Sequence, residues 1–139
     1  MQPLPQSDDL TSLVLRTNFD DDRRWEAFME NLSRIGDYRM ATFVSDTVYA
    51  GATVQQLVDA DATADIDYKV FYLFVVDTKT LADDEHPLLA VDLDTEPGRS
   101  FRVPVQFYAD VSANLSIANM DFADFADAVD ATGTYRGFD

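Results

Sequence analysis

Acidic residues follow the predicted strands of this chain, and their spacing could support metal chemistry. Each of the first four predicted strands is followed by carboxylates, namely Asp20–Asp22, Asp46, Asp77, and Asp92 with Asp94. In a parallel sheet the carboxyl ends of the strands line one crevice, where ligands usually bind. Carboxylates gathered there could hold Mg²⁺, a hard cation that prefers oxygen ligands. The pattern therefore allows a magnesium site of Asp20, Asp46, Asp77 and Asp92, as in a receiver-like or phosphoryl-transfer domain.

The same positions have a simpler structural interpretation. Aspartate is a preferred helix-capping and turn residue, and these positions all lie where a predicted strand meets a helix or a loop. A receiver-type site would also use a lysine on a late strand, whereas Lys69 and Lys79 are the only lysines. We therefore favour capping over metal binding and expect no cofactor, with Mg²⁺ as the alternative.

His86 is the only histidine, and it lies on a predicted loop in DDEHPLL. A general base needs a partner within reach, and the chain has neither a cysteine nor a GxSxG-type nucleophile elbow. We predict a loop histidine whose pKa is raised by the neighbouring carboxylates. The scattered glycines form neither a Walker loop nor a dinucleotide fingerprint. Without any of these catalytic or nucleotide-binding motifs, the sequence favours a protein that is not an enzyme.

Two arginines, Arg16 and Arg102, interrupt otherwise apolar predicted strands. In a chain with this many carboxylates, the simplest expectation is an internal ion pair that ties a loop to the sheet. The same expectation extends to Arg99 and Arg136. An anion or substrate clamp is the functional alternative.

The charge balance is the strongest feature of the composition. Asp and Glu number 26 against 10 Lys and Arg, which gives a formal net charge of −16 and a pI near 4.1. Such a surface repels nucleic-acid phosphates and anionic membranes and favours basic partners or cations. Solubility alone would also explain it. The candidate contact residues are two acidic loops, Asp20, Asp21, Asp22 and Asp83, Asp84, Glu85, followed by Asp127 and Asp130.

Hydrophobic periodicity predicts one α/β domain with the order β-α-β-α-β-β-β-α, in two or three layers. The predicted strands are 10–17, 38–45, 68–76, 88–93 and 101–105, of which 68–76 is the most apolar and is expected at the centre of the sheet. The first strands should form a parallel core and the last two an antiparallel hairpin, with Pro104 at an edge. The predicted helices are 25–35, which ends at Gly36, a short helix that opens with a Thr53–Gln56 capping box, and a C-terminal helix. Gln106–Ala113 is predicted to be a connector.

The C-terminal helix has the clearest local signals in the chain. Asp121 is expected to cap it with Asp124 in its first turn, and Met120 with Phe125 fits a hydrophobic staple. A buried stripe follows at helical spacing, and Gly133 should end the helix. Because Asp121 and Asp124 are used at the N-terminus, Asp127 and Asp130 are expected to remain as free charges on its outer face.

Length and composition bound the remaining possibilities. A chain of 139 residues has room for one domain, which we place at 10–139 after a flexible lead-in at 1–9. Without cysteine there are no disulfides. The first residues do not form a signal peptide, and no apolar run reaches the ~18 residues of a membrane span. We therefore expect a soluble, cytoplasmic protein.

Four motifs together resemble a known family. They are LVLRTNFDDDRRWEAF, FVSDTVYAGATVQQL, DEHPLLAVDLDTEPGRSFRV and NLSIANMDFADFADAV, and they extend over nearly the whole chain. The set resembles a domain-of-unknown-function family of short acidic bacterial proteins, largely actinobacterial. The resemblance implies a small stand-alone cytoplasmic domain and assigns no activity to any residue.

The leading functional hypothesis is a non-enzymatic binding protein whose acidic surface docks on a basic partner. An immunity protein or antitoxin would work in this way, by covering a toxin and speeding association through charge. A nucleic-acid mimic, with carboxylates in place of phosphates, is closely related. The alternatives are the magnesium-dependent domain described above and a housekeeping domain whose charge serves solubility only.

Overall fold

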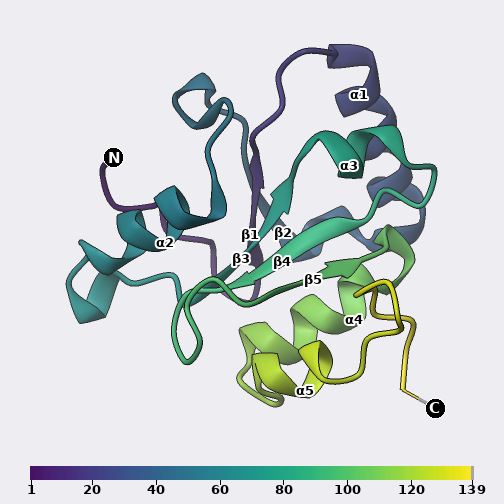
Figure 1. Ribbon diagram of the computed structural model, residues 1–139. Helices are drawn as coiled ribbons and strands as arrows, with labels where there is room; N and C mark the ends of the chain where they lie inside the picture. Colours follow the sequence, from purple (N-terminus) through teal and green to yellow (C-terminus); the bar gives the residue numbers. More distant parts are fainter. Residues whose placement is uncertain (139) are drawn as a thin grey trace.

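The computed structural model describes residues 1–138, which form a mixed sheet of five strands (Figure 1). The strands are β1 (Ser12–Arg16), β2 (Ala41–Val44), β3 (Tyr72–Val76), β4 (Leu88–Asp92) and β5 (Ser100–Val103), in the order β2-β1-β3-β4-β5. β1 runs parallel to β2 and β3, whereas β4 is antiparallel to both β3 and β5. The predicted α/β class is confirmed, with β3 at the centre of the sheet and an antiparallel β4–β5 hairpin that ends at Val103, directly before Pro104.

Helices cover both faces of the sheet, so the protein has three layers (Figure 1). α2 (Val54–Ala62) packs on one face. The other face is covered by α1 (Asp22–Asn31), which continues as a π-helical turn at Leu32–Gly36, and by α3 (Thr78–Ala82), α4 (Val105–Ser116) and α5 (Phe122–Ala126). The connection from β1 to β2 passes through α1 on one face of the sheet, and the connection from β2 to β3 passes through α2 on the other face. The crossover connections therefore change face between the neighbouring strands β1 and β3.

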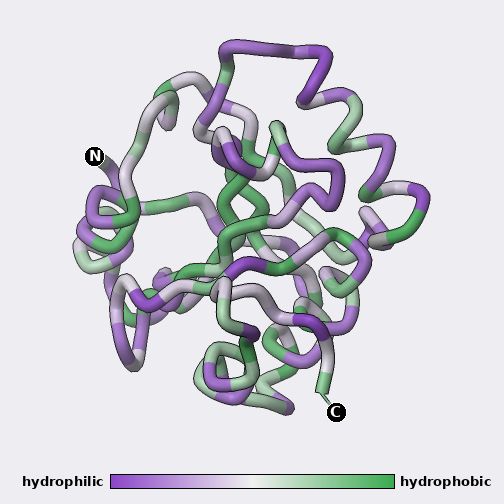
Figure 2. Tube along the Cα trace, turned by 45° about the vertical axis from the view of Figure 1, so that its right-hand side comes forward, coloured by the Kyte–Doolittle hydropathy of each residue, from purple (hydrophilic) through white to green (hydrophobic). Residues whose placement is uncertain are grey.

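Alternating residues of the central strands enter two separate core clusters. Val14, Phe74 and Val76 pack under α1 and α4, whereas Leu15 and Val75 pack under α2. A strand that is buried on both faces needs apolar residues at every position, which explains the nearly continuous hydrophobic sequence of β3. Hydrophobic residues accordingly concentrate in the strands at the centre of the molecule, although hydrophobic segments also occur at the periphery (Figure 2).

The predicted connector at Gln106–Ala113 is wrong, because this segment lies within α4. Val105, Tyr108, Val111 and Ser112 are buried at helical spacing, so the amphipathic pattern is present in the sequence. Pro104 precedes the helix, a position where its missing N–H has no intrahelical partner to lose. α3 was also missed, since it occupies only five residues of what was expected to be an acidic loop.

The C-terminal helix begins as predicted but is shorter. The Asp121–Asp124 capping box is confirmed, while the helix ends at Ala126 instead of continuing to Gly133. Asp130 accepts hydrogen bonds from the N–H groups of Thr132 and Thr134, which folds the chain into a turn. The segment after this turn pairs with β5 through Arg102 and Thr134, so its backbone groups are satisfied outside a helix.

The lead-in has no regular secondary structure, but it is not wholly loose, because Leu4 is buried in the cluster beneath α2. The domain division at residue 10 stays a prediction, and its last residue, Asp139, lies outside the described residues. Across residues 1–138, no helix has the length and apolar character required to cross a membrane.

Candidate functional site

The first candidate site is the carboxyl edge, the end of the sheet where β1, β2 and β3 finish. The crossover changes side between β1 and β3, and ligands of open α/β sheets usually bind at such a point. A cleft of about 380 Å³ opens there. Its lining residues come from the loops after the three strands: Thr17, Asn18, Phe19, Asp20, Ala50, Gly51, Ala52, Asp77 and Thr78.

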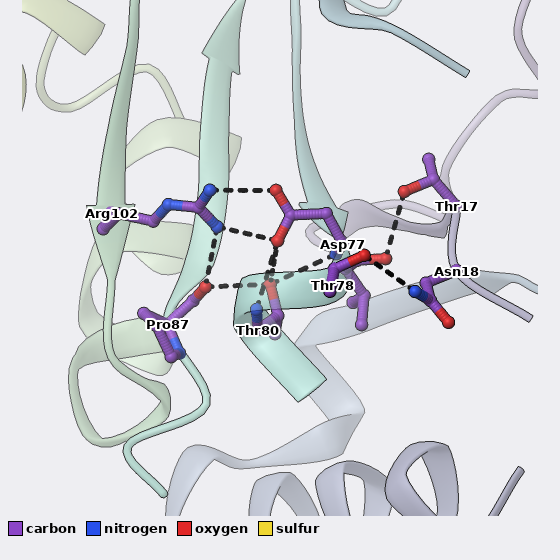
Figure 3. Close-up of polar contacts among 8 residues, drawn as sticks. Thr17, Asn18, Asp77, Thr78, Thr80, Pro87 and Arg102 are labelled. Atoms are coloured by element: carbon purple, nitrogen blue, oxygen red, sulfur yellow. Dashed lines mark hydrogen bonds and ion pairs between the residues drawn. The ribbon is translucent and has the colours of Figure 1, made fainter. Parts of the chain in front are cut away.

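Asp77 is the most engaged carboxylate of this edge (Figure 3). It caps α3 by accepting the N–H of Thr80 at 3.1 Å, and both of its oxygens accept from Arg102 at 2.9 Å. Burial raises the pKa of Asp77, but the bonds from Arg102 and from the Thr80 N–H outweigh that effect and hold the pKa below its usual value. The expected ion pair of Arg102 is therefore confirmed, and Asp77 has little capacity left for a ligand.

The loop after β1 uses its charges in a similar way. Asp21 caps α1 by accepting from the N–H groups of Arg23 and Arg24. Asp22 pairs with Arg16 at 2.9 Å, as expected for that arginine. Arg16 is only 5% exposed, and its guanidinium lies over the rings of Phe19 and Trp25.

Asp46 and Asp20 complete the carboxylates near this edge. Asp46 caps a short 3-10 turn by accepting the N–H of Val48 at 3.0 Å. Asp20 lines the cleft, and its own N–H donates to Asn18 Oδ1. The capping interpretation is thus confirmed for Asp46, as it is for Asp21 and Asp77.

Asp92 lies at the opposite end of the sheet, so the expectation that it shares a crevice with Asp20, Asp46 and Asp77 is wrong. The reason is the antiparallel direction of β4, whose last residue pairs with Tyr72, the first residue of β3. Asp92 instead accepts from the N–H groups of Asp94 and Glu96 in the hairpin turn. In the described part of the chain, no three His, Asp or Glu residues are grouped closely enough to hold a metal ion.

Asp127 and Asp130 are ion-paired, so the expectation that they are free charges is wrong. Arg99 pairs with both Asp127 and Glu96. Arg136 pairs with Asp130 at 3.4 Å and with Glu85, one of the predicted contact residues. The Thr132 hydroxyl, followed by the backbone of Thr134, lowers the pKa of Asp130 to about 2.

His86 lies beside Asp83 and Asp84, as expected, yet its pKa is lowered. Burial disfavours the charged imidazole more than the two carboxylates favour it. The ring contacts Phe28 edge-on, and its Nδ1 lies 2.8 Å from the amide nitrogen of Asn31. The predicted upward shift of the pKa is wrong, because the sequence did not indicate that the ring packs against Phe28 and Asn31 of α1.

A second candidate site lies at the amino edge, the other end of the sheet, where β1 and β3 begin. Two adjoining hollows of about 550 and 260 Å³ form what we call the amino-edge groove. They share Phe71, Tyr72, Asp94, Leu115 and Ala118. The larger hollow extends over 7–11, 70 and 116, and the smaller over 92, 95–96 and 120–123. No sequence motif indicated this groove, because its walls come from segments far apart in the chain.

The groove combines exposed apolar groups with unpaired acids. Leu10 and Phe71 are 66% and 39% exposed. Six carboxylates line the groove, of which Asp92 accepts backbone N–H groups in the hairpin turn and Glu96 pairs with Arg99. We call the other four the rim carboxylates: Asp8, Asp9, Asp94 and Asp121. Within residues 1–138, none of the four makes an ion pair. Arg99 pairs with Glu96 of the smaller hollow and with Asp127, and Lys69 donates to the carbonyl of Asp61, so neither makes an ion pair with the rim carboxylates.

Three residues of the groove have left-handed backbone conformations that residues other than glycine rarely adopt. The φ angles of Leu10, Phe71 and Ala118 are +63°, +72° and +55°. Ala118 follows α4 in a Schellman arrangement, in which Asn119 N–H donates to the carbonyl of Asn114. Glycine is the usual residue at that position. Backbone strain of this kind often concentrates at functional sites.

The chain belongs to the family described as a domain of unknown function, DUF6924, whose model matches residues 11–138. The family resemblance expected from the sequence motifs is therefore confirmed. No curated protein matches the chain.

Proposed function

We propose that this protein is a non-enzymatic acidic binding protein that docks on a basic partner protein. The observation that carries the proposal is how the chain uses its few cations. Six of its 10 basic residues pair with its own carboxylates: Arg16, Arg24, Arg39, Arg99, Arg102 and Arg136. The rim carboxylates have no such pair in the described residues, so a partner could supply the compensating cations.

The net charge of −16 supports the same function. It favours association with a positively charged protein and disfavours nucleic acids and anionic membranes. An immunity protein or antitoxin that covers a bacterial toxin fits this electrostatic role, as does a nucleic-acid mimic on a nucleic-acid-binding protein. A cytoplasmic location is part of the proposal.

The carboxyl edge supports a structural rather than a catalytic role. Asp77 and Arg102 satisfy one another, and Asp21 and Asp46 cap helical segments. His86 bonds to the side-chain amide of Asn31 and packs on Phe28. These engagements favour binding over the magnesium-dependent alternative.

The test is to identify the partner in the native host and measure how its affinity depends on salt. We expect a basic protein whose Kd rises tenfold or more between about 50 and about 500 mM salt, because exposed charges are screened over this range. The matched control is an unrelated acidic protein of similar net charge, which should not capture the same partner. A specific partner whose affinity does not change with salt would overturn the proposal.

A further inference from the structure

We infer that the amino-edge groove is the docking surface, and that it receives a polypeptide segment in which one large apolar side chain is flanked by lysines or arginines. This inference rests on the proposed function and adds to it the place of the contact and the chemistry of the partner.

The floor of the groove requires an apolar anchor in the partner. Phe71, Tyr72, Leu115 and Met120 line it, and Phe71 remains 39% exposed. The larger hollow, of about 550 Å³, has the size of ordinary ligand pockets, which range over roughly 300–1,000 Å³. It can therefore hold a large side chain together with its neighbours. A purely polar cation, such as a polyamine, would leave this surface in water.

The rim of the groove requires positive charge. Asp8 and Asp9 lie on the lead-in side, while Asp94 and Asp121 come from the hairpin turn and the start of α5. Carboxylates from several segments around an apolar surface match an apolar side chain with cations before and after it. The same carboxylates repel phosphates, which disfavours a nucleic acid in this groove.

The shape of the groove is held by the fold. Phe71 keeps its left-handed conformation while its carbonyl accepts the N–H of Leu93, and the Tyr72 hydroxyl bonds to Ser12 of β1. Ser12 in turn bonds to Ser112 of α4 at 2.6 Å. A preformed surface loses less conformational freedom on binding than a flexible loop.

The experiment is an NMR titration of the ¹⁵N-labelled chain with three five-residue peptides. The first is Lys-Lys-Trp-Lys-Lys, the second replaces Trp with Ser, and the third replaces every Lys with Ser. We expect the first peptide to shift the amide signals of Phe71, Asp94 and Leu115. The other two should bind about tenfold more weakly, since each lacks either the buried anchor or the charges.

Matched variants locate the contact. The triple variant Asp8→Asn, Asp9→Asn, Asp94→Asn should weaken binding of the first peptide about tenfold. The control is the triple variant Asp20→Asn, Glu26→Gln, Glu30→Gln, which changes the net charge by the same amount. It should change the affinity for the first peptide by less than about twofold. Phe71→Gly removes the ring at a position whose backbone suits glycine, so the fold should tolerate it. It should remove the preference for Trp over Ser.

Three results would overturn the inference. The first is a set of shifts at the carboxyl edge or scattered over the surface, and the second is equal weakening by the two triple variants. The third is equal affinity for the Trp and Ser peptides, which would show that the groove does not bind an apolar side chain. If the native partner binds in a salt-dependent way but ignores the groove variants, the docking surface is wrong and the proposed function stands. A salt-independent partner would instead refute the proposed function.

Discussion

At the carboxyl edge of the sheet, carboxylates accept hydrogen bonds from helix N-termini and pair with arginines. Asp77 binds both Thr80 and Arg102, and Asp22 binds Arg16. At the amino edge, three of the four rim carboxylates, Asp8, Asp9 and Asp94, line a groove with exposed apolar groups and, within residues 1–138, make no ion pair. Asp21, Asp22, Asp46 and Asp77 are thus engaged within the chain at the carboxyl edge, with Asp20 as the exception, whereas Asp8, Asp9 and Asp94 make no ion pair in the described residues.

The topology explains the difference. Helices that follow strands begin at the carboxyl edge, where free N–H groups favour acidic caps. At the amino edge, α2 and α4 end and β1 and β3 begin. Helix C-termini disfavour negative charge, so capping does not explain Asp8, Asp9 or Asp94 there. Acidic residues in such a place are therefore stronger candidates for contact with a partner than acidic residues in caps.

The largest expected effect comes from Asp77→Ala, which removes a cap and leaves Arg102 without its partner. We expect the free energy of unfolding to fall by about 2–3 kcal/mol, measured by urea denaturation. Asp20→Ala is the control at the same edge, since the side chain of Asp20 caps no helix, and it should change stability by less than about 0.5 kcal/mol. Equal losses in the two variants would refute the specific role of Asp77.

A milder variant, Asp77→Asn, keeps an oxygen for the Thr80 N–H and loses the charge that pairs with Arg102. We expect a loss of about 1–2 kcal/mol at neutral pH. The folded pKa of Asp77 is lowered, so its contribution is complete above the unfolded value of about 3.9 and disappears as pH falls through the folded value. The difference between wild type and variant should therefore shrink in acid. A difference that stays constant from neutral pH to about pH 2 would contradict this assignment.

At the amino edge, Ala118→Gly should stabilise the protein by about 1 kcal/mol, because glycine adopts the left-handed conformation without strain. Thermal and urea unfolding would both measure the gain. Ala113→Gly is the matched control inside α4, and it should cost about 1 kcal/mol. If both substitutions destabilise, the groove does not store strain at Ala118.

The smallest expected effect is that of Asp94→Ala. Because the side chain of Asp94 has no ion-pair partner in the described residues, its removal should change the free energy of unfolding by less than about 0.5 kcal/mol. A loss as large as that of Asp77→Ala would show that the two edges do not differ. Both variants can be compared in the same urea series.

The sequence determined the features that depend on a few neighbouring residues. The Thr53–Gln56 and Asp121–Asp124 capping boxes are confirmed, because a cap and its partner are three residues apart. The apolar sequence of β3 indicated a central strand for the same local reason. Arginines on apolar strands indicated ion pairs, although the partners Asp22 and Asp77 were not specified.

Only the tertiary structure decided which distant residues meet. The antiparallel direction of β4 placed Asp92 at the amino edge, and packing against α1 lowered the pKa of His86. Arg99 and Arg136 bind Asp127 and Asp130 only because the tail folds back beside β5. The amino-edge groove likewise exists only where the lead-in, β3, the hairpin turn and α4 converge. Strand direction and such convergence follow from burying two apolar faces of one sheet at once, which is a property of the whole chain and of no local segment.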